Sequence, residues 1–264
     1  MRYGTSLLVR QVIEDGLSNR FLATLPPHDF SLLAPHLRTV ALEQGVILQD
    51  AGAEIERVYF LHSGMVSLVA VMPNGATVET AIIGRAGAIG TMAGLGARWG
   101  FARAIVQLPG TAVWLSAHGF HQAANQSPAI RDLVVRFNDL LFAQVQQSVA
   151  CNALHSLEAR LCGWLLQAHD CVDGNAIPLT QDFLAQMLGV RRTTVNFAAH
   201  LLQSAGVIRY RRGLIQIVDR AALEDTSCEC YAVIRHKIDK IFPPARFEIT
   251  NGSASEKRSP VPSG

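Results

Sequence analysis

Short apolar runs separated by turn-forming residues occupy the stretch from residue 38 to residue 115. Pro73-Asn74-Gly75 lies between two of these runs, and Asn and Gly both accept the positive φ of a tight turn. Regularly spaced short strands with such turns favour an antiparallel sandwich or barrel. A short helical segment, residues 19–33, is expected before it. The clearest strand candidates are residues 57–62, 65–71, 77–83 and 104–108.

The apolar pattern changes at Ser127-Pro128 to spacings of three and four. Ser is a favoured N-cap and Pro a favoured first helical residue. Residues 129–151 then contain no Gly or Pro, so a helix of six turns or more is expected. Its apolar stripe is wide enough for one side to pack on the β domain and the other on a second copy, with packing within one chain as the alternative. The expected dimer-helix residues are Leu133, Phe137, Leu140, Leu141 and Gln144.

A further helix is predicted over residues 157–169, and the most informative segment follows it at residues 180–208. Thr180 suits an N-cap, and Asp182 in the first turn suits the helix dipole. Ala185 is small where a crossing helix must come close, and Gly189 permits positive φ in a tight turn. Val195, six residues later, is the expected core residue of the second helix. This spacing meets the packing requirements of a helix-turn-helix.

The exposed positions of the second helix of such a motif face base edges in the major groove. Arg192 can pair with guanine and Asn196 with adenine through two hydrogen bonds each. Residues 209–217 read as a β-hairpin wing whose arginines suit the phosphate backbone. The candidate DNA-binding residues are Thr180, Gln181, Arg191, Arg192, Thr193, Thr194, Asn196, Phe197, His200, Arg209, Arg211 and Arg212.

The charge distribution supports this interpretation. The whole chain carries a formal charge of only +2, but residues 183–218 contain five arginines and no Asp or Glu. A local excess of positive charge is typical of a phosphate-binding face, although a solvated basic face has the same composition.

The 264-residue chain is long enough for two domains, each with its own core. Its apolar runs fall short of transmembrane length, and residues 1–16 lack the apolar region of a signal peptide, so we expect a cytoplasmic protein without a membrane partner. The five cysteines do not suggest a disulfide framework. Cys151, Cys162 and Cys171 are interpreted as small buried apolar residues, and Cys228 and Cys230 as a close pair near the tail. No metal site or cofactor is predicted.

The order of short strands, long helix, helix-turn-helix and hairpin wing along this chain resembles that of the Crp/Fnr family of transcription regulators. The resemblance covers roughly residues 19–224 and is carried by residues 59–68, 84–96 and 179–217. It implies a homodimer that recognises a pseudo-palindromic operator in double-stranded DNA, with RNA polymerase as a partner if the protein is an activator. The expected fold is α+β: an N-terminal antiparallel jelly roll, a long dimerisation helix and a C-terminal winged helix-turn-helix. The predicted domains are a sensor (1–126), the dimerisation helix and hinge (127–156), the DNA-binding domain (157–225) and a largely disordered extension (226–264).

The departures from the family pattern concern the effector. Family members that bind cyclic AMP carry a Glu after an Ile/Leu-Gly pair and an Arg-Ser or Arg-Thr later. Here Ile89-Gly90 is followed by Thr91, and Arg103 is displaced by one place with Ala on both sides. Without that carboxylate we do not expect ordinary cyclic AMP binding, and the effector is an unknown small molecule or redox signal. The candidate pocket residues are Gly90, Thr91, Met92, Arg103 and Ala104.

Other cofactor and enzyme readings are disfavoured. An iron–sulfur centre of Fnr type needs an N-terminal cysteine cluster, whereas the first cysteine here is Cys151. A haem would need a ligand such as His62, and a single His in a strand is more often structural. A metal oxygenase on the β domain would need a His-x-His pair, but His118 and His121 stand three apart near a helical stretch. The frequent family Glu before the valine is Thr193 here, so the operator is expected to differ from that of cyclic AMP receptors.

Overall fold

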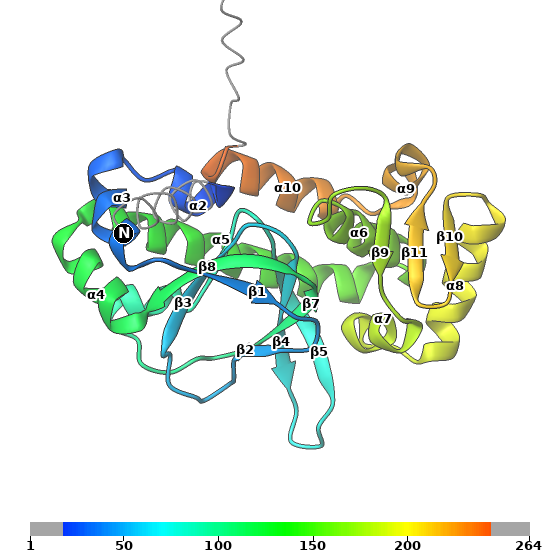
Figure 1. The fold of residues 1–264 in the computed structure, drawn as a ribbon. Helices are drawn as coiled ribbons and strands as arrows, with labels where there is room; N and C mark the ends of the chain where they lie inside the picture. The colour runs from blue at the N-terminus through cyan, green and yellow to red at the C-terminus, as the bar shows by residue number, and fades with distance from the viewer. Residues whose placement is uncertain (1–17, 244–264) are drawn as a thin grey trace, which may run out of the picture.

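The computed structural model describes residues 18–243. Two short helices, α2 (Arg20–Ala23) and α3 (Pro27–Leu33), and a 3-10 turn, η1 (Ala34–His36), lead into two facing four-stranded antiparallel sheets (Figure 1). The antiparallel β domain predicted from the apolar runs, and the jelly roll that the family resemblance implied, are therefore confirmed. One sheet has the order β1 (Arg38–Leu42), β8 (Gly110–Ser116), β3 (Arg57–Leu61), β6 (Ala88–Ile89), and the other β2 (Ile47–Gln49), β7 (Arg103–Leu108), β4 (Met65–Val71), β5 (Thr77–Ile83).

The turn between β4 and β5 forms where Pro73-Asn74-Gly75 predicted it. Gly75 has φ +84°, and the Asn74 side chain accepts a hydrogen bond from the Ala76 amide at 3.0 Å. After β6 comes a 3-10 segment, η2 (Thr91–Leu95), and after β8 the helix α4 (Ala117–Gln126). These elements enclose an apolar core in which the ring of Phe60 contacts those of Phe21 and Phe120, and Phe21 also contacts Phe137.

The long helix α5 (Pro128–Leu154) begins where the sequence indicated. The Ser127 hydroxyl accepts a hydrogen bond from the Ile130 amide at 3.1 Å, and Pro128 occupies the first turn. The face of α5 that was predicted to contact a second copy is instead buried against the jelly roll of the same chain. Leu133, Phe137, Leu140 and Gln144 are at most 5% exposed, and Leu141 packs against the same core. These five residues hold α5 on its own jelly roll, so the alternative of packing within one chain applies to this face.

The second domain follows the predicted order. It comprises α6 (Leu157–His169), β9 (Ala176–Pro178), α7 (Gln181–Leu188), α8 (Arg192–Ser204), β10 (Ile208–Arg211), β11 (Leu214–Ile217) and α9 (Arg220–Thr226). The three strands form a small antiparallel sheet of order β10-β11-β9. α6 is buried on nearly all sides, from Leu161 to Leu166, because other elements of the domain and α10 pack around it.

The C-terminal extension contains a helix, α10 (Cys230–Ile241), so the prediction of a largely disordered tail from residue 226 is wrong over this segment. Tyr231, Ile234, Ile238 and Ile241 recur at helical spacing, and the apolar face that they form packs on α5 and α6. The ring of Phe242 is fully buried and stacks on Phe21 at 5.7 Å. In Figure 1, α10 thus runs from the second domain back to the N-terminal helices. The predicted tail segment 244–264 and the first seventeen residues of the predicted sensor domain lie outside the described residues.

The two domains share packing and hydrogen bonds. Met65, Val69 and Leu108 of the jelly roll belong to the same apolar cluster as the core of the second domain. The Gln186 amide donates to the Thr77 hydroxyl at 2.5 Å, and the Trp164 indole N–H donates to the Glu79 carboxylate at 2.8 Å. Within residues 18–243, no helix combines the length and the apolar character that crossing a membrane requires.

Candidate nucleic-acid interface

The turn between α7 and α8 has the geometry that the sequence spacing required. The Thr180 hydroxyl caps α7 by accepting from the Phe183 amide at 3.3 Å. Gly189 ends the helix with φ +66°, a conformation that a Cβ disfavours. Ala185 and Val195 are 6% and 0% exposed, so the small residue and the core valine lie in the crossing of α7 and α8 as expected.

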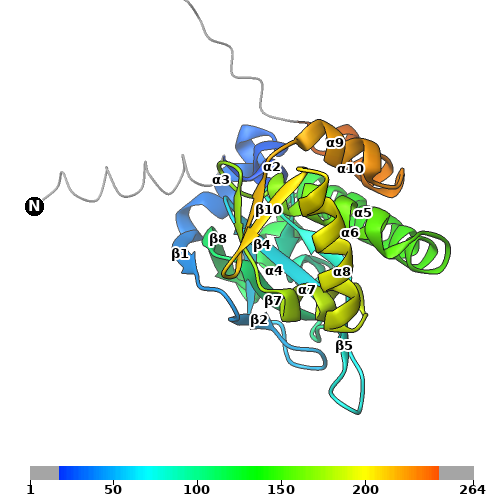
Figure 2. The same ribbon diagram turned by 90° about the vertical axis from the view of Figure 1, so that its right-hand side faces the viewer.

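The opposite side of α8 faces solvent along its whole length. Val195, Ala198, Ala199 and Leu202 form the buried face, whereas Leu201 beside them is 39% exposed. Figure 2 has α8 at the front of the second domain, away from the jelly roll. The predicted DNA-contact residues on α8 and its N-cap are all exposed: Arg191, Arg192, Thr193, Thr194, Asn196, Phe197 and His200.

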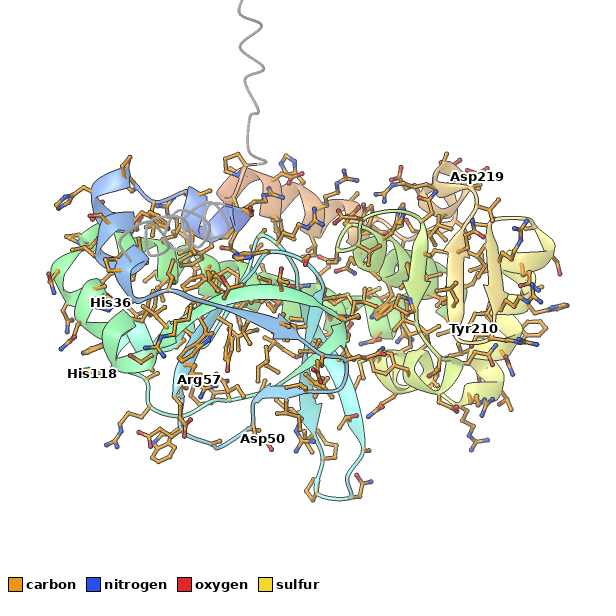
Figure 3. All side chains as sticks on the ribbon, in the orientation of Figure 1. His36, Asp50, Arg57, His118, Tyr210 and Asp219 are labelled. Atoms are coloured by element: carbon orange, nitrogen blue, oxygen red, sulfur yellow. The ribbon has the colours of Figure 1, made fainter. Side chains whose placement is uncertain are left out.

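The predicted wing is a hairpin with a two-residue turn. Arg212 and Gly213 both have positive φ, +49° and +77°, which is the type I′ arrangement that matches the twist of paired strands. Arg209, Arg211 and Arg212 are exposed on it. The Tyr210 amide donates to the Gln203 side chain at 2.8 Å, which fixes the wing against α8. Figure 3 shows Tyr210 on this wing, at the far end of the molecule from His118.

One carboxylate lies close to the basic face. Asp182 on α7 forms an ion pair with Arg192 at 3.1 Å, and both side chains are more than 60% exposed. Exposed ion pairs of this kind stabilise a fold by about 0–1 kcal/mol. Arg192 can therefore leave Asp182 for another acceptor at little cost. Thr180 and Gln181 lie at the start of α7, the first exposed and the second half-buried.

The five effector-pocket candidates do not surround any of the five cavities described within residues 18–243. Arg103 makes two hydrogen bonds to the Asp50 carboxylate, at 2.9 and 3.1 Å, and these bonds lower the pKa of Asp50. Thr91 and Ala104 are 3% and 0% exposed. Gly90 packs so closely that a Cβ there would lie 2.7 Å from the Arg57 carbonyl oxygen, and the side chain of Met92 packs against the apolar core. The guanidinium that the pocket would need is thus already paired within the chain.

A cavity of about 90 Å³ lies instead between the two domains, lined by residues of β5, α5, α6, α7 and α10. Glu79 lines it and accepts hydrogen bonds from the Trp164 indole and the Ser67 hydroxyl. Burial raises the pKa of Glu79 to about 7 in spite of these two bonds. Glu79 could not be predicted as a cavity residue, because a Glu in an alternating strand has the pattern of a solvent-facing position.

The same cavity is lined by Cys151 and by the Cys228–Cys230 pair, which the sequence had given no reason to connect. Cys151 Sγ, His155 and the sulfurs of Cys228 and Cys230 have their potential ligand atoms within 4.8 Å of one another. Cys151 is half-buried in this group and is not the apolar core residue that we expected, whereas Cys162 and Cys171 are buried as predicted. The four-residue spacing of Cys151 and His155 on one helix was the available sequence signal.

Comparisons with known proteins agree with the geometry. The sequence profile of the cyclic nucleotide-binding domain matches residues 39–127, and that of the Crp-like helix-turn-helix domain matches residues 159–226. Together they match more than half of the chain. Among curated proteins, none matches this sequence significantly.

Solved structures show the same fold at low sequence identity. FixK2 from Bradyrhizobium japonicum is 13% identical with a TM-score of 0.62, over 73% of this chain and 98% of its own. A Crp/Fnr-family transcriptional regulator from Thermus thermophilus is 23% identical with a TM-score of 0.58, over 72% and 98%. The c-di-GMP-responsive global regulator CLP of Xanthomonas campestris is 13% identical with a TM-score of 0.58, over 73% and 99%.

Proposed function

Since the chain belongs to the Crp/Fnr family of transcription regulators, with a cyclic nucleotide-binding domain followed by a Crp-like helix-turn-helix, we propose that it binds a pseudo-palindromic operator as a homodimer. The observation that carries this proposal is the solvent-facing side of α8. Its first turns present Arg192 and Asn196, while Val195 on the opposite side anchors the helix in the core. A helix in this setting enters the major groove with its N-terminal residues toward the bases.

In the proposed complex, Arg192 and Asn196 read bases and the wing arginines hold the phosphate backbone. The expected partners of Arg192 are the N7 and O6 acceptors of guanine, which a guanidinium reaches with two hydrogen bonds. Arg209, Arg211 and Arg212 extend the positive surface beside α8 and carry no sequence information. Thr180, Gln181, Thr193, Thr194 and His200 are proposed as further phosphate or base contacts.

The proposed dimer contact is the exposed stripe of α5. Val135, Phe142 and Val149 recur every seven residues and are 45%, 64% and 65% exposed. A seven-residue repeat of apolar side chains is the pattern with which two helices form a coiled coil. Paired in this way, two copies would present their α8 helices to half-sites about one helical turn of DNA apart.

We propose that the sensor domain comprises residues 1–126, the dimerisation helix and hinge 127–156, and the DNA-binding domain 157–225. The effector site of this sensor differs from an ordinary cyclic AMP pocket, since Arg103 is paired with Asp50. We propose the bacterial cytoplasm as its location, because a DNA partner is found there. RNA polymerase becomes a partner if the protein activates transcription.

The proposal is tested by selecting DNA sequences with the full-length protein and measuring affinity for the selected site and a scrambled site. Two symmetric half-sites are expected, with affinity about 10³-fold or more above that for scrambled DNA. Asn196→Ala should lower affinity for the selected site, whereas Arg98→Ala, an exposed arginine in the jelly roll, should leave it unchanged. Failure to enrich any sequence would contradict the proposal.

A further inference from the structure

Cys151, His155, Cys228 and Cys230 come together from two parts of the chain. Cys151 and His155 lie one helical turn apart at the C-terminal end of α5, and the His155 amide donates to the Cys151 carbonyl at 3.1 Å. Cys228 precedes α10, and Cys230 is its first residue. The Cys151 and Cys228 sulfurs are 3.5 Å apart, and Cys230 Sγ is 3.4 Å from His155 Nδ1.

We propose that these four side chains form a tetrahedral binding site for one divalent metal ion of the zinc class. Zinc binds thiolate sulfur at about 2.3 Å and imidazole nitrogen at about 2.0–2.1 Å, so neighbouring ligand atoms in a tetrahedron are about 3.5–3.8 Å apart. The Cys151–Cys228 and Cys230–His155 distances nearly match that spacing, and all four ligand atoms lie within 4.8 Å of one another, so small movements would allow them to bind one ion. The cysteine sulfurs that bind a four-iron cluster lie farther apart, because the cluster is larger than one ion. The short distances between the four ligand atoms here therefore fit a single metal ion better.

The surroundings of the cluster suit such an ion. His155 Nε2 lies 3.3 Å from the Glu229 carboxylate, which would hold the imidazole with Nδ1 free to bind the metal. The Gln147 amide donates to the Cys230 sulfur at 3.1 Å. The half-buried Arg160 lines the same cavity, and its positive charge offsets the charge of the site.

Binding of one Zn²⁺ by three thiols and a neutral imidazole releases three protons and leaves a site with net charge −1. No electron is transferred in this step. Since α5 packs on the jelly roll and α10 follows the DNA-binding domain, the ion would join the two domains across the hinge at residues 155–156. Any effect of the ion on DNA affinity rests on the proposed function, whereas binding of the ion does not.

The test is a titration of the reduced, chelator-treated full-length protein with Zn²⁺ and, as a spectroscopic probe, with Co²⁺. We expect one equivalent of either ion per chain, visible absorption of tetrahedral Co²⁺ with sulfur-to-metal charge transfer, and loss of that absorption when Zn²⁺ is added. Calorimetry in buffers of different ionisation enthalpy should give about three protons released per ion at neutral pH. This measurement needs no variant.

Variants assign the ligands. Cys228→Ser and Cys230→Ser should abolish stoichiometric binding, and Glu229→Gln should weaken it about 10–100-fold. Cys171→Ala, which removes a buried cysteine outside the cluster, should bind one ion like the unchanged chain. Far-UV circular dichroism checks that each variant is folded.

Three results would overturn the site. The first is no stoichiometric binding under reducing conditions, and the second is release of one proton or fewer per ion. The third is an iron–sulfur cluster, formed on anaerobic reconstitution, that depends on these cysteines. If the full-length protein binds one metal ion per chain but shows no preference for any DNA sequence, the proposed function is contradicted and the metal site is not.

Discussion

Replacing Glu79 by Gln is expected to stabilise the protein above pH 7 and to change its pH dependence. The Glu79 carboxyl lies at the boundary between β5 and α6, where burial raises its pKa from 4.5 to about 7. Its hydrogen-bond donors are Ser67 on β4 and Trp164 on α6. Other titratable or charged groups line the same cavity, and the buried thiol of Cys171 also lies near the carboxyl. The cavity-lining groups are Cys151, Arg160, Cys228, Cys230 and Tyr231.

The sign follows from linkage between protonation and folding. Because the pKa is higher in the folded state, folding favours the protonated carboxyl. The stability that this group contributes is complete below about pH 4.5 and is lost as the pH rises through about 7. At about 1.4 kcal/mol for each pH unit, the full loss is about 3 kcal/mol. Because the Glu79 side chain is only partly buried, we expect a smaller loss of about 1–3 kcal/mol in the free energy of unfolding.

Glutamine keeps the geometry of the site while removing the charge. Its carbonyl oxygen can accept from the Trp164 indole, and its amide can donate to the Ser67 hydroxyl, which then acts as the acceptor. The free energy of unfolding of the Gln variant minus that of the unchanged chain should therefore be about 1–3 kcal/mol larger at pH 8 than at pH 5.

The measurement is urea unfolding of both proteins at pH 5 and pH 8, with chelator present so that metal occupancy does not vary. Comparing the two proteins at each pH cancels the titration of every other group. Glu56→Gln, on the exposed surface of the same domain, is the matched control and should show no such difference. A stability difference that is equal at pH 5 and pH 8 would refute the reasoning.

Three further predictions follow from the proposed function. Phe142→Glu should raise the dissociation constant of the dimer about 30-fold or more (about 2 kcal/mol), because it places two charges in an apolar interface. Sedimentation would measure this change, and an unchanged dimer would mean that the dimer contact does not include Phe142. Arg192→Ala should lower the binding free energy for the selected operator by about 1–3 kcal/mol and relax the specificity at one base pair per half-site. Arg211→Ala should lower the affinity for all DNA sequences similarly and reduce the log–log slope of affinity against salt by roughly one. If Arg192→Ala loses affinity equally on operator and scrambled DNA, Arg192 does not read a base. Cyclic AMP should show no micromolar binding by calorimetry, because Thr91 stands where the ribose-binding carboxylate is expected; measurable heat of binding would identify a different ribose contact.

Local patterns in the sequence determined most of the secondary structure. The bounds of β4, β5 and α6 agree with the predicted segments residue for residue, since each is marked by a clear period and by Gly, Pro or Ser at its ends. Gly189 and the α7–α8 spacing predicted the helix-turn-helix for the same reason: a tight turn needs positive φ, and a close crossing needs a small residue. The amphipathic spacing of α10 was also present in the sequence, but low overall apolar content hid it.

Only the tertiary structure decided which face of α5 is free and which distant groups meet. Periodicity shows that a helix has two apolar stripes but not which one the core takes, so Phe137 is buried and Phe142 is exposed. Glu79 and Trp164 are 85 residues apart, and Cys151 and Cys228 are 77 residues apart. Such pairs depend on how the two domains and α10 pack together, which is set by the summed burial of many apolar side chains and leaves no local pattern around the residues that it brings into contact.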